Sequence, residues 1–376
     1  MRNHGYTIPE KCDVLVIGSG AAGLTAASSA ASLGLDVVVV ETADRVGGAT
    51  AWSGGWVWLP SDDDADLVKC HAYLEDTTGP QSEPAKITAF VQNAGALLKF
   101  LSEETLVRFQ KDVSIPDYQQ DAIGATMHGR SRVVAAMDGR VIGTHLGRLR
   151  APLRVLTIAG LMPAAGSEMR HFFNATRSYQ SFFYVCKRLL GHGMQLLQAG
   201  RRRTLTNGNA LAGGLFKAAL DLNVTVFTQT SAQSLIKKNR RVTGAILTTP
   251  IGTKEVSASR GVILASGGIS GNSELQYRHY PHVEAGHSHK TMSPPEIQGD
   301  GLTMAILAGA KALSYGHGSA AWVPVSLIPT KQGTVQPFPH FADRAKPGLI
   351  AVRADGRRFG NEAAPYFDFT RDMWGG

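Results

Sequence analysis

The apolar and polar positions near the N-terminus predict a strand, a tight turn, a helix and a second strand. Val14 to Ile17 and Val37 to Val40 are uninterrupted apolar runs of the kind found in buried parallel strands. Between them, Ala21 to Leu33 is rich in alanine and leucine, which suits a helix lying close to a sheet. This strand–helix–strand order is typical of an α/β nucleotide-binding fold.

The same alternation continues further along the chain. Ala85 to Thr105 predicts a helix, and Thr206 to Ala210 predicts a turn that leads into a helix over Leu211 to Leu220. Four strands are expected after it, at residues 224–227, 232–236, 242–247 and 262–264. The last is predicted to be buried and to return to the N-terminal sheet, which is the simplest topology.

A segment from Pro152 to Arg203 interrupts this pattern and is predicted to be helical. It combines apolar pairs such as Phe172-Phe173 and Leu189-Leu190 with several basic residues. Two interpretations compete: the segment packs on its own domain or on a partner subunit, or it forms an amphipathic surface that touches a membrane. The broad aromatic face favours packing, so membrane association is the less favoured interpretation.

The turn after the first strand is the main candidate for a cofactor site. Gly18 lets the chain turn off the strand, Gly20 lets a pyrophosphate approach the backbone, and Gly23 lets the helix pack on the strand. The N–H groups of this helix start, Ala22 included, would face the phosphates. Glu41 ends the second strand, where a carboxylate can accept hydrogen bonds from ribose hydroxyls. A dinucleotide site is therefore expected here.

Residues after Glu41 favour a flavin over a nicotinamide dinucleotide, which remains the weaker alternative. The stretch from Arg45 to Trp56 is dominated by small residues, so its backbone can run almost in contact with a cofactor. Its candidate cofactor contacts are Gly47, Gly48, Thr50, Ser53, Gly54 and Gly55.

Two further glycine-rich segments extend the expected site. Gly267 and Gly268 follow the returning strand, and Asp300 marks the start of a helix within the triplet Gly299 to Gly301. Near the C-terminus, Ala354 to Arg357 predicts a hairpin turn between short strands. The first two segments are expected to pass beside the cofactor.

Composition narrows the class of protein. The chain has 376 residues, 43% hydrophobic and 18% charged, with a net charge of +8, and is expected to be an ordinary globular protein. No nucleic-acid-binding fold accompanies the positive charge. The three cysteines lack metal-ligand spacing, so no metal is expected, and their scattered positions favour a reducing, cytoplasmic compartment. The first twelve residues contain no apolar signal core, and no long uninterrupted apolar run occurs, so neither a leader nor a spanning segment is expected.

Several of these motifs together resemble the fumarate-reductase and 3-ketosteroid Δ1-dehydrogenase family of flavoproteins. The resemblance rests on the Gly18 to Gly23 turn with Glu41, the loop Gly47 to Gly55 and the strand end at Gly267-Gly268. The Gly299 to Gly301 triplet and the stretch Ala354 to Tyr366 complete the set. The motifs occur in the same order as in the family, along essentially the whole chain. Their residues are more similar to those of the ketosteroid branch.

The resemblance implies non-covalent FAD and removal of two hydrogens from adjacent carbons beside a ketone. By motif position, Tyr366 matches the family's catalytic tyrosine, and Tyr118 matches its partner tyrosine. Arg371 lies where the fumarate branch places its proton-donating arginine, so reduction of an unsaturated acid is the alternative reaction. The implied substrate is a small apolar, steroid-like ketone or an unsaturated acid, and the electron acceptor is not implied.

The expected fold is a Rossmann-type FAD-binding domain with a second α+β catalytic, or capping, domain. The first is assigned to residues 1–278, with the helical segment at about 151–203, and the second to residues 279–376. The second domain is expected to be C-terminally incomplete, because the family's later cofactor segment does not follow Gly376. A non-catalytic fragment that binds FAD is therefore a third hypothesis.

Overall fold

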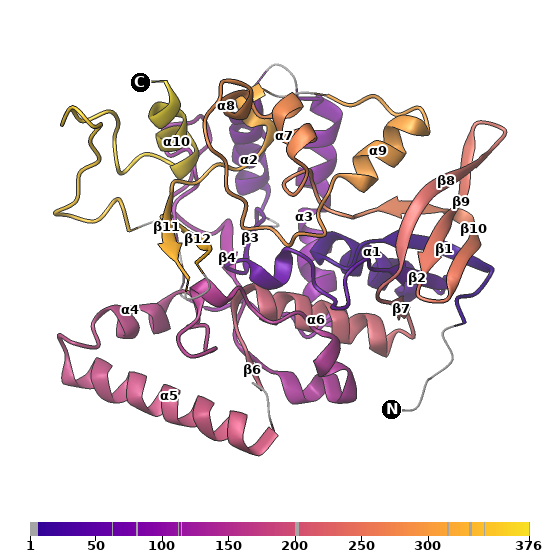
Figure 1. The fold of residues 1–376 in the computed structure, drawn as a ribbon, viewed down its shortest axis with the longest axis horizontal. Helices are drawn as coiled ribbons and strands as arrows, with labels where there is room; N and C mark the ends of the chain where they lie inside the picture. Colours follow the sequence, from indigo (N-terminus) through magenta and orange to yellow (C-terminus); the bar gives the residue numbers. More distant parts are fainter. Residues whose placement is uncertain are drawn as a thin grey trace. The chain divides into compact units, whose positions relative to one another are not determined.

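The structure, a computed structural model, consists of two compact units (Figure 1). One unit comprises residues 1–268 and 300–311, and the other comprises residues 269–299 and 312–376. The described residues are 7–61, 63–79, 82–111, 113, 115–199, 203–313, 316–330, 333–341 and 343–375. The division into functional domains at residue 278 stays a prediction.

The first unit is built on a six-stranded sheet with the order β7-β2-β1-β10-β9-β8. Its strands are β1 (Lys11–Ile17), β2 (Val37–Val40), β7 (Thr225–Phe227), β8 (Ser231–Lys238), β9 (Arg241–Thr249) and β10 (Gly252–Leu264). The four strands β7, β2, β1 and β10 are parallel to their neighbours, and β9 and β8 continue the sheet antiparallel. The expected return of the last strand beside the first is confirmed, because β10 pairs with β1.

Apolar side chains cover both faces of the central strands. Val14 and Val16 alternate toward a core formed with α1 (Ala21–Ser32) and α6 (Asn207–Asp221), which pack on each other. Leu15 and Ile17 point to the other face, where Met304 of α9 (Asp300–Leu307) joins their cluster. This two-sided burial explains why β1 and β2 are continuous apolar runs.

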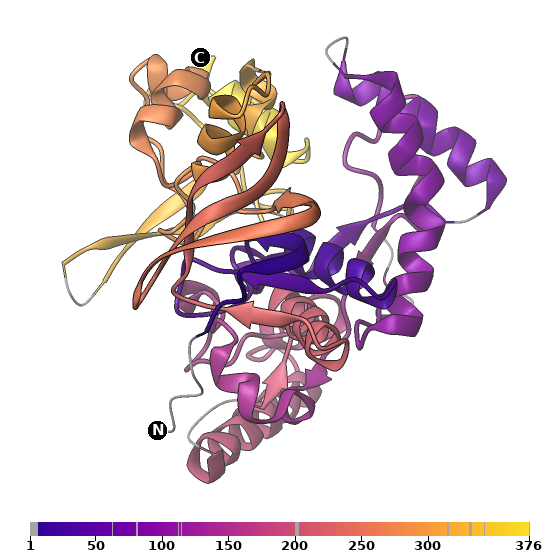
Figure 2. The ribbon, with the colours of Figure 1, turned by 90° about the vertical axis from the view of Figure 1, so that its right-hand side faces the viewer.

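The remaining elements of the first unit surround this sheet (Figure 2). Short strands are β3 (Trp56–Trp58), β4 (Ser131–Val133), β5 (Met137–Asp138) and β6 (Thr204–Leu205). Helices are α2 (Asp64–Thr78), α3 (Pro84–Glu104), α4 (Ser167–Phe173) and α5 (Tyr179–Ala199), with 3-10 turns η1 (Thr50–Trp52), η2 (Gly139–Arg148) and η3 (Arg154–Leu156). The long helices α2 and α3 pack against each other.

Three expectations about the first unit were wrong in detail. Among the described residues between 152 and 203, helix occurs only in η3, α4 and α5, because Gly160 and Gly166 adopt positive φ angles that break the helix. The expected turn at Thr206 to Ala210 already belongs to α6, which begins at Asn207. Val262 to Leu264 is a strand but is not fully buried, since β9 pairs only with Gly252 to Ser257 of β10.

The second unit contains shorter elements. They are α7 (Ser273–His279), α8 (Pro281–Glu284), η4 (Gly316–Ser319), β11 (Val325–Pro329), β12 (Val335–Pro339) and α10 (Tyr366–Trp374). The two strands pair antiparallel. The expected turn at Ala354 to Arg357 is present, and the strands expected beside it amount to one bridge between Val352 and Arg358.

Candidate functional site

The three motif glycines after β1 meet different surroundings. A Cβ on Gly18 would lie 2.3 Å from the carbonyl oxygen of Ala265, and a Cβ on Gly23 would lie 1.9 Å from the carbonyl oxygen of Gly18. A Cβ on Gly20 would meet nothing closer than Thr50 Oγ1, at 3.6 Å. Gly18 and Gly23 are thus required by chain packing, whereas Gly20 leaves open space at the start of α1.

Glu41 is held at this turn by backbone and side-chain donors. Its Oε2 accepts hydrogen bonds from Ser19 N at 3.0 Å and Ser19 Oγ at 2.5 Å, and its Oε1 accepts one from Ala43 N at 3.0 Å. Glu41 is buried, with 8% of its surface exposed. Each carboxylate oxygen can accept more than one hydrogen bond, so Glu41 keeps acceptor capacity for a ribose hydroxyl.

The loop after β2 crosses the same turn. Gly47 N donates to Ser19 Oγ at 3.1 Å, and Ala21 N donates to Thr50 Oγ1 at 2.9 Å. A Cβ on Gly48 would lie 3.6 Å from Gly20 Cα, so the two glycine segments pass each other closely. Sequence reasoning did not single out Ser19, although it stands inside the motif and joins the loop to Glu41.

The N-terminus of α6 packs against this loop. Sequence reasoning also missed this contact. Gly208 N donates to Ser53 O at 3.0 Å, and a Cβ on Gly208 would lie 2.0 Å from Thr50 O. A Cβ on Gly55 would lie 2.3 Å from the carbonyl carbon of Asn207. Asn207, Gly208 and Asn209 were interpreted as a turn signal, and this interpretation did not reveal the close packing of Gly208 against the loop.

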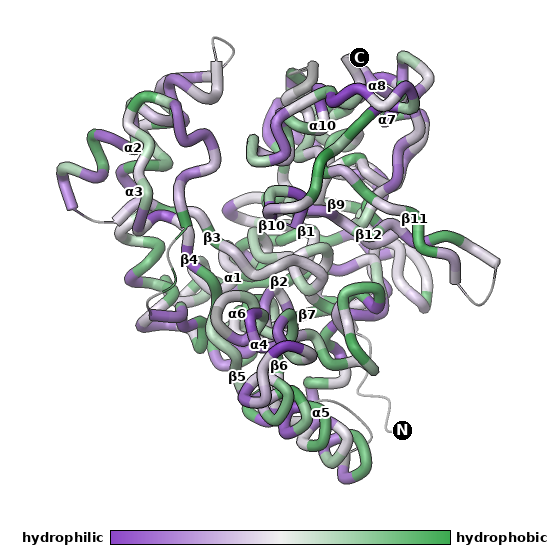
Figure 3. The backbone as a smooth tube through the Cα atoms, turned by 90° about the vertical axis from the view of Figure 1, so that its left-hand side faces the viewer, coloured by the Kyte–Doolittle hydropathy of each residue, from purple (hydrophilic) through white to green (hydrophobic). Residues whose placement is uncertain are grey.

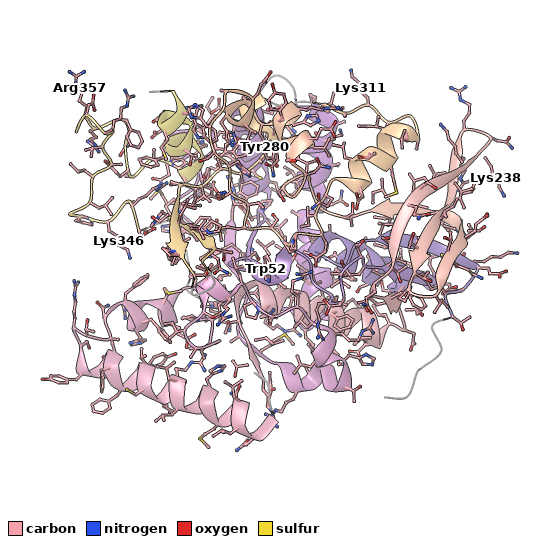
Figure 4. The ribbon with its side chains drawn as sticks, in the orientation of Figure 1. Trp52, Lys238, Tyr280, Lys311, Lys346 and Arg357 are labelled. Atoms are coloured by element: carbon pink, nitrogen blue, oxygen red, sulfur yellow. The ribbon has the colours of Figure 1, made fainter. Side chains whose placement is uncertain are left out.

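Trp52 anchors the Gly47 to Gly55 loop to residues 150 and 151 (Figure 4). Its Nε1 donates to Ala151 O at 2.9 Å, and the Arg150 guanidinium lies 5.3 Å from its ring centroid. Ser53 and Gly54 beside it are exposed. The loop therefore combines a fixed end with exposed backbone.

The two later glycine segments of the first unit lie near the turn through the end of β10. Ala265 N donates to Ile17 O at 2.8 Å, and a Cβ on Gly301 would lie 2.2 Å from Ser266 Oγ. Gly267 and Gly268 follow as exposed residues, and Asp300 is exposed in the first turn of α9. The structure thus brings the turn, Glu41, the Gly47 to Gly55 loop and the β10 end together.

This arrangement fits the phosphates of a dinucleotide. The residue capping α1 is Gly20, which offers no side chain to the N-terminal N–H groups, and Ala22 in the first turn is exposed. An open helix N-terminus attracts anions through its N–H groups and its dipole. The space that a Cβ at Gly20 would enter is where such a group can approach the backbone.

Tyr118 lies in the first unit, in a loop whose flanking residues are anchored. Asp117 on its N-terminal side accepts hydrogen bonds from Trp58 Nε1 at 2.8 Å and Arg130 Nη1 at 2.6 Å. Gln119 on its C-terminal side donates from its backbone N to Tyr73 Oη at 2.9 Å. Burial raises the pKa of Tyr73, which keeps this phenol neutral. Tyr118 itself is half-buried.

Tyr366 and Arg371 lie in the second unit, on α10. Tyr366 is half-buried at the first position of the helix, and its ring meets Phe341 edge-on at a centroid distance of 5.4 Å. Arg371 is exposed and pairs with Asp368 at 3.4 Å. Five positions separate the two residues, which places them about 140° apart around the helix.

The segment before Tyr366 is fixed by two arginines. Arg344 is buried and donates to the carbonyl oxygens of Glu362 at 3.1 Å and Ala364 at 2.5 Å. Arg358 binds the Glu362 carboxylate, which also accepts from Ala351 N at 2.8 Å. Arg358 thereby lowers the pKa of Glu362 to about 2. The chain that leads to Tyr366 is thus held by charge-assisted bonds at neutral pH.

Neither a cluster of metal ligands nor a membrane-spanning helix is present among the described residues. No group of three or more His, Cys, Asp or Glu side chains could hold a metal ion. No helix in that part of the chain is both long enough and apolar enough to cross a bilayer.

Comparisons with known proteins agree with the geometry of the turn. Residues 13–376 match a family model described as an FAD binding domain. The chain is 36% identical over 372 residues to a 4-oxocyclohex-2-ene-1-carboxylate 5-dehydrogenase of Sinomonas cyclohexanicum, covering 96% of this chain and 62% of the relative. It is 29% identical over 393 residues to a 3-oxosteroid 1-dehydrogenase of Mycobacterium tuberculosis (strain CDC 1551 / Oshkosh), covering 99% and 65%.

A solved structure resembles the chain over nearly its whole length. The 3-ketosteroid Δ1-dehydrogenase from Sterolibacterium denitrificans, in complex with 1,4-androstadiene-3,17-dione, matches with a TM-score of 0.85 and 29% identity. The match covers 98% of this chain and 66% of that chain. The chain therefore spans just under two thirds of the length of these relatives, and the expected α/β fold is confirmed.

Proposed function

Because the chain belongs to the FAD-binding-domain family, we propose that it is an FAD-dependent dehydrogenase acting on a carbon–carbon bond beside a ring ketone. The observation that carries the proposal is the convergence of the Gly18 to Gly23 turn, Glu41 and the Gly47 to Gly55 loop through the hydrogen bonds of Ser19 and Thr50. Both curated relatives described above are dehydrogenases of ring ketones by name. Their reaction is extended here to this chain.

The first unit holds the cofactor in this proposal. The N-terminus of α1 and the open space beside Gly20 receive the pyrophosphate, and Glu41 accepts hydrogen bonds from the ribose. The Gly47 to Gly55 loop, Gly267-Gly268 and Asp300 supply further contacts. When bound, FAD accepts the hydride that leaves the substrate. None of these residues is a Cys, His or Tyr, which supports non-covalent binding.

Two tyrosines handle the proton in this proposal. A carbon beside a ketone is a weak acid, so its proton must pass to a positioned base as the hydride leaves. Tyr366 is assigned as that base and Tyr118 as the second tyrosine of the family's pair, following their motif positions. The anchored neighbours of each support the assignment: Asp117 and Gln119 beside Tyr118, and the Arg344-bound segment before Tyr366.

The proposed substrate is a cyclic ketone with a saturated bond next to the carbonyl. The relatives' names span a steroid and a small ring ketone that carries a carboxylate. A 3-ketosteroid is the finer proposal that the sequence motifs favour. The cytoplasm is the proposed location, supported by three free cysteines among the described residues.

Anaerobic reduction of the bound flavin tests the proposal. The purified protein is expected to be yellow, to release its FAD on denaturation, and to bleach with a 3-ketosteroid or with 4-oxocyclohexanecarboxylate. Tyr366→Phe is expected to lower kcat by about 100-fold or more while FAD content stays unchanged, because only the proton acceptor is lost. Tyr277→Phe, at an exposed tyrosine of α7, is the matched control.

Two other outcomes would redirect the proposal. Stoichiometric FAD with no bleaching by any ring ketone would favour a non-catalytic FAD-binding chain. Turnover of an unsaturated acid with a reduced dye, abolished in Arg371→Ala, would favour the reductase alternative. The exposed position of Arg371 beside Asp368 gives that alternative no support.

A further inference from the structure

Helix α5 presents a stripe of apolar side chains outward and several polar side chains inward. Tyr179, Phe183, Leu190 and Leu197 are 88%, 68%, 70% and 89% exposed. Their spacing puts them on one stripe of the helix, and Phe182 and Met194, also exposed, flank it. A helix at the surface of a soluble domain normally has the opposite orientation.

Polar contacts fix this orientation. Arg188 binds the buried Glu168 of α4, and Tyr184 Oη donates to the same carboxylate at 3.2 Å. The ring of His192 is buried, with its Nε2 3.1 Å from Ala159 O. Because these partners lie on the inner side, the helix cannot rotate its apolar stripe inward without breaking a buried ion pair.

The C-terminal end of α5 is also held by polar contacts. Gln195 Nε2 donates to Thr204 Oγ1 at 3.1 Å, and its Oε1 accepts from Arg203 N at 3.0 Å. The expectation that this segment packs an apolar face on its own domain is therefore wrong for α5, whereas the expected packing on a partner subunit stays a prediction. The polar face of α5 packs on its own domain, and its apolar face is exposed.

The stripe is large and lies at the edge of its unit. From Tyr179 to Leu197 it runs roughly 27 Å along the helix axis. Phe173, on the neighbouring α4, is 61% exposed and extends it. Figure 3 shows hydrophobic residues in green along α5 at the periphery of the first unit, away from the sheet. Continuous exposed apolar patches of this kind mark interaction surfaces.

Charge favours an anionic partner. Between residues 167 and 199, the sequence has four basic residues, Arg170, Arg177, Lys187 and Arg188, and one acid, Glu168. Arg188 neutralises that acid. Arg170, Arg177 and Lys187 are exposed, and Lys187 lies on α5 beside the stripe. A second copy of the chain docked on this face would bring two such cationic sets together, which is unfavourable.

We propose that α5 is a membrane-surface anchor that lies in the interface of an anionic bilayer with its aromatic stripe inserted among the lipids. Aromatic and aliphatic side chains supply the apolar contact, and the exposed cations bind lipid phosphates. The helix lies on the membrane and does not cross it, as expected from its polar inner face. This inference is independent of the proposed reaction.

Sedimentation with vesicles tests the anchor on the full-length protein. The protein is expected to pellet with phosphatidylcholine vesicles that contain phosphatidylglycerol, and less with phosphatidylcholine alone or at high salt. The double variant Phe183→Glu with Leu190→Glu is expected to weaken binding by at least about tenfold, because two inserted apolar side chains are lost. Lys187→Glu should weaken binding to anionic vesicles only.

The matched control is Ile251→Glu, at an isoleucine that is 77% exposed in the β9–β10 turn. This variant should bind vesicles like the unchanged protein. All the substituted side chains are exposed, so circular dichroism is expected to remain unchanged, which confirms the fold in each variant. Absence of vesicle binding would overturn the proposal. A dimer in light scattering that the double variant converts to a monomer, without vesicle binding, would assign the face to a second copy instead.

Discussion

Gly18, Gly20 and Gly23 serve two different physical purposes within one turn. Gly18 and Gly23 touch other parts of the backbone so closely that no side chain fits, and Gly18 also has a φ of 107°. Gly20 has an ordinary φ of −73° and open space beyond it. The motif thus mixes residues needed for folding with a residue needed only when a phosphate is present.

Substitutions at Gly20 and Gly23 should separate these purposes. Gly20→Ala is expected to leave thermal stability of the FAD-free protein nearly unchanged and to weaken FAD binding by about tenfold or more, because the methyl group enters the phosphate position. Gly23→Ala should destabilise the fold by more than about 3 kcal/mol, because its Cβ would overlap the Gly18 carbonyl. Thermal unfolding and FAD titration by fluorescence quenching measure both effects. Equal behaviour of the two variants would contradict this division.

Among the elements, the loop that carries Tyr118 depends on a buried arginine that lies immediately before β4. Arg130 is fully buried and donates to Asp66 of α2 and to Asp117, while its guanidinium lies over Trp58 and Tyr73. Hydrogen bonds from Ser61 and Arg130 outweigh burial and lower the pKa of Asp66, so it is ionised at neutral pH. One cation therefore joins a helix, a strand and the loop.

Removing one partner of this arginine should cost stability. Asp117→Ala is expected to lower the free energy of unfolding by about 3–5 kcal/mol, because it leaves a buried guanidinium with one carboxylate partner. Asp121→Ala, at an exposed acid of the same loop, is the control and should change it by less than about 0.5 kcal/mol. Urea unfolding monitored by tryptophan fluorescence gives both values. A small effect in Asp117→Ala would mean that water replaces the lost carboxylate.

The elements also show which parts of the fold can be predicted from sequence. β1, α1 and β2 were predicted correctly because each has both a strong periodicity and a local turn signal, so tertiary contacts did not change the outcome. The start of α6 was missed because Asn207 and Gly208 are typical turn residues, and only their packing against Ser53 makes them helical. The Arg130 network could not be predicted, since its members are 64 and 13 residues apart in the chain.

For the whole molecule, the chain passes from one unit to the other at two of the glycine segments, Gly267-Gly268 and Gly299 to Gly301. The chain leaves the first unit after Gly268, returns at Asp300 and leaves again after Lys311. The residues assigned to the cofactor all lie in the first unit, whereas Tyr366 and Arg371 lie in the second. The family motifs indicated this division of roles, but the return of α9 to the sheet depends on the contact of Met304 with the β1 and β2 side chains.

The rates at which a maleimide labels the three cysteines test the burial of three different parts of the chain in one experiment. Burial raises the pKa of Cys12 and of Cys70 to about 11, so at pH 8 only about one thiol in a thousand is ionised at either position. Cys186 is half-buried on α5, on the side of the helix that carries the aromatic stripe. A maleimide should therefore modify Cys186 rapidly and the other two slowly.

The labelling rates of the three cysteines are expected to respond differently to pH and to vesicles. Labelling of Cys12 and Cys70 should rise about tenfold per pH unit toward pH 11, because their thiolate fraction does. Anionic vesicles should slow the labelling of Cys186 without affecting the buried pair, since an inserted stripe removes its thiol from water. Peptide mass analysis after timed quenching distinguishes the three sites, and Cys186→Ser identifies the fast one. Rapid labelling of Cys186 on saturating vesicles would mean that α5 binds the membrane through its cations alone, without inserting its aromatic side chains.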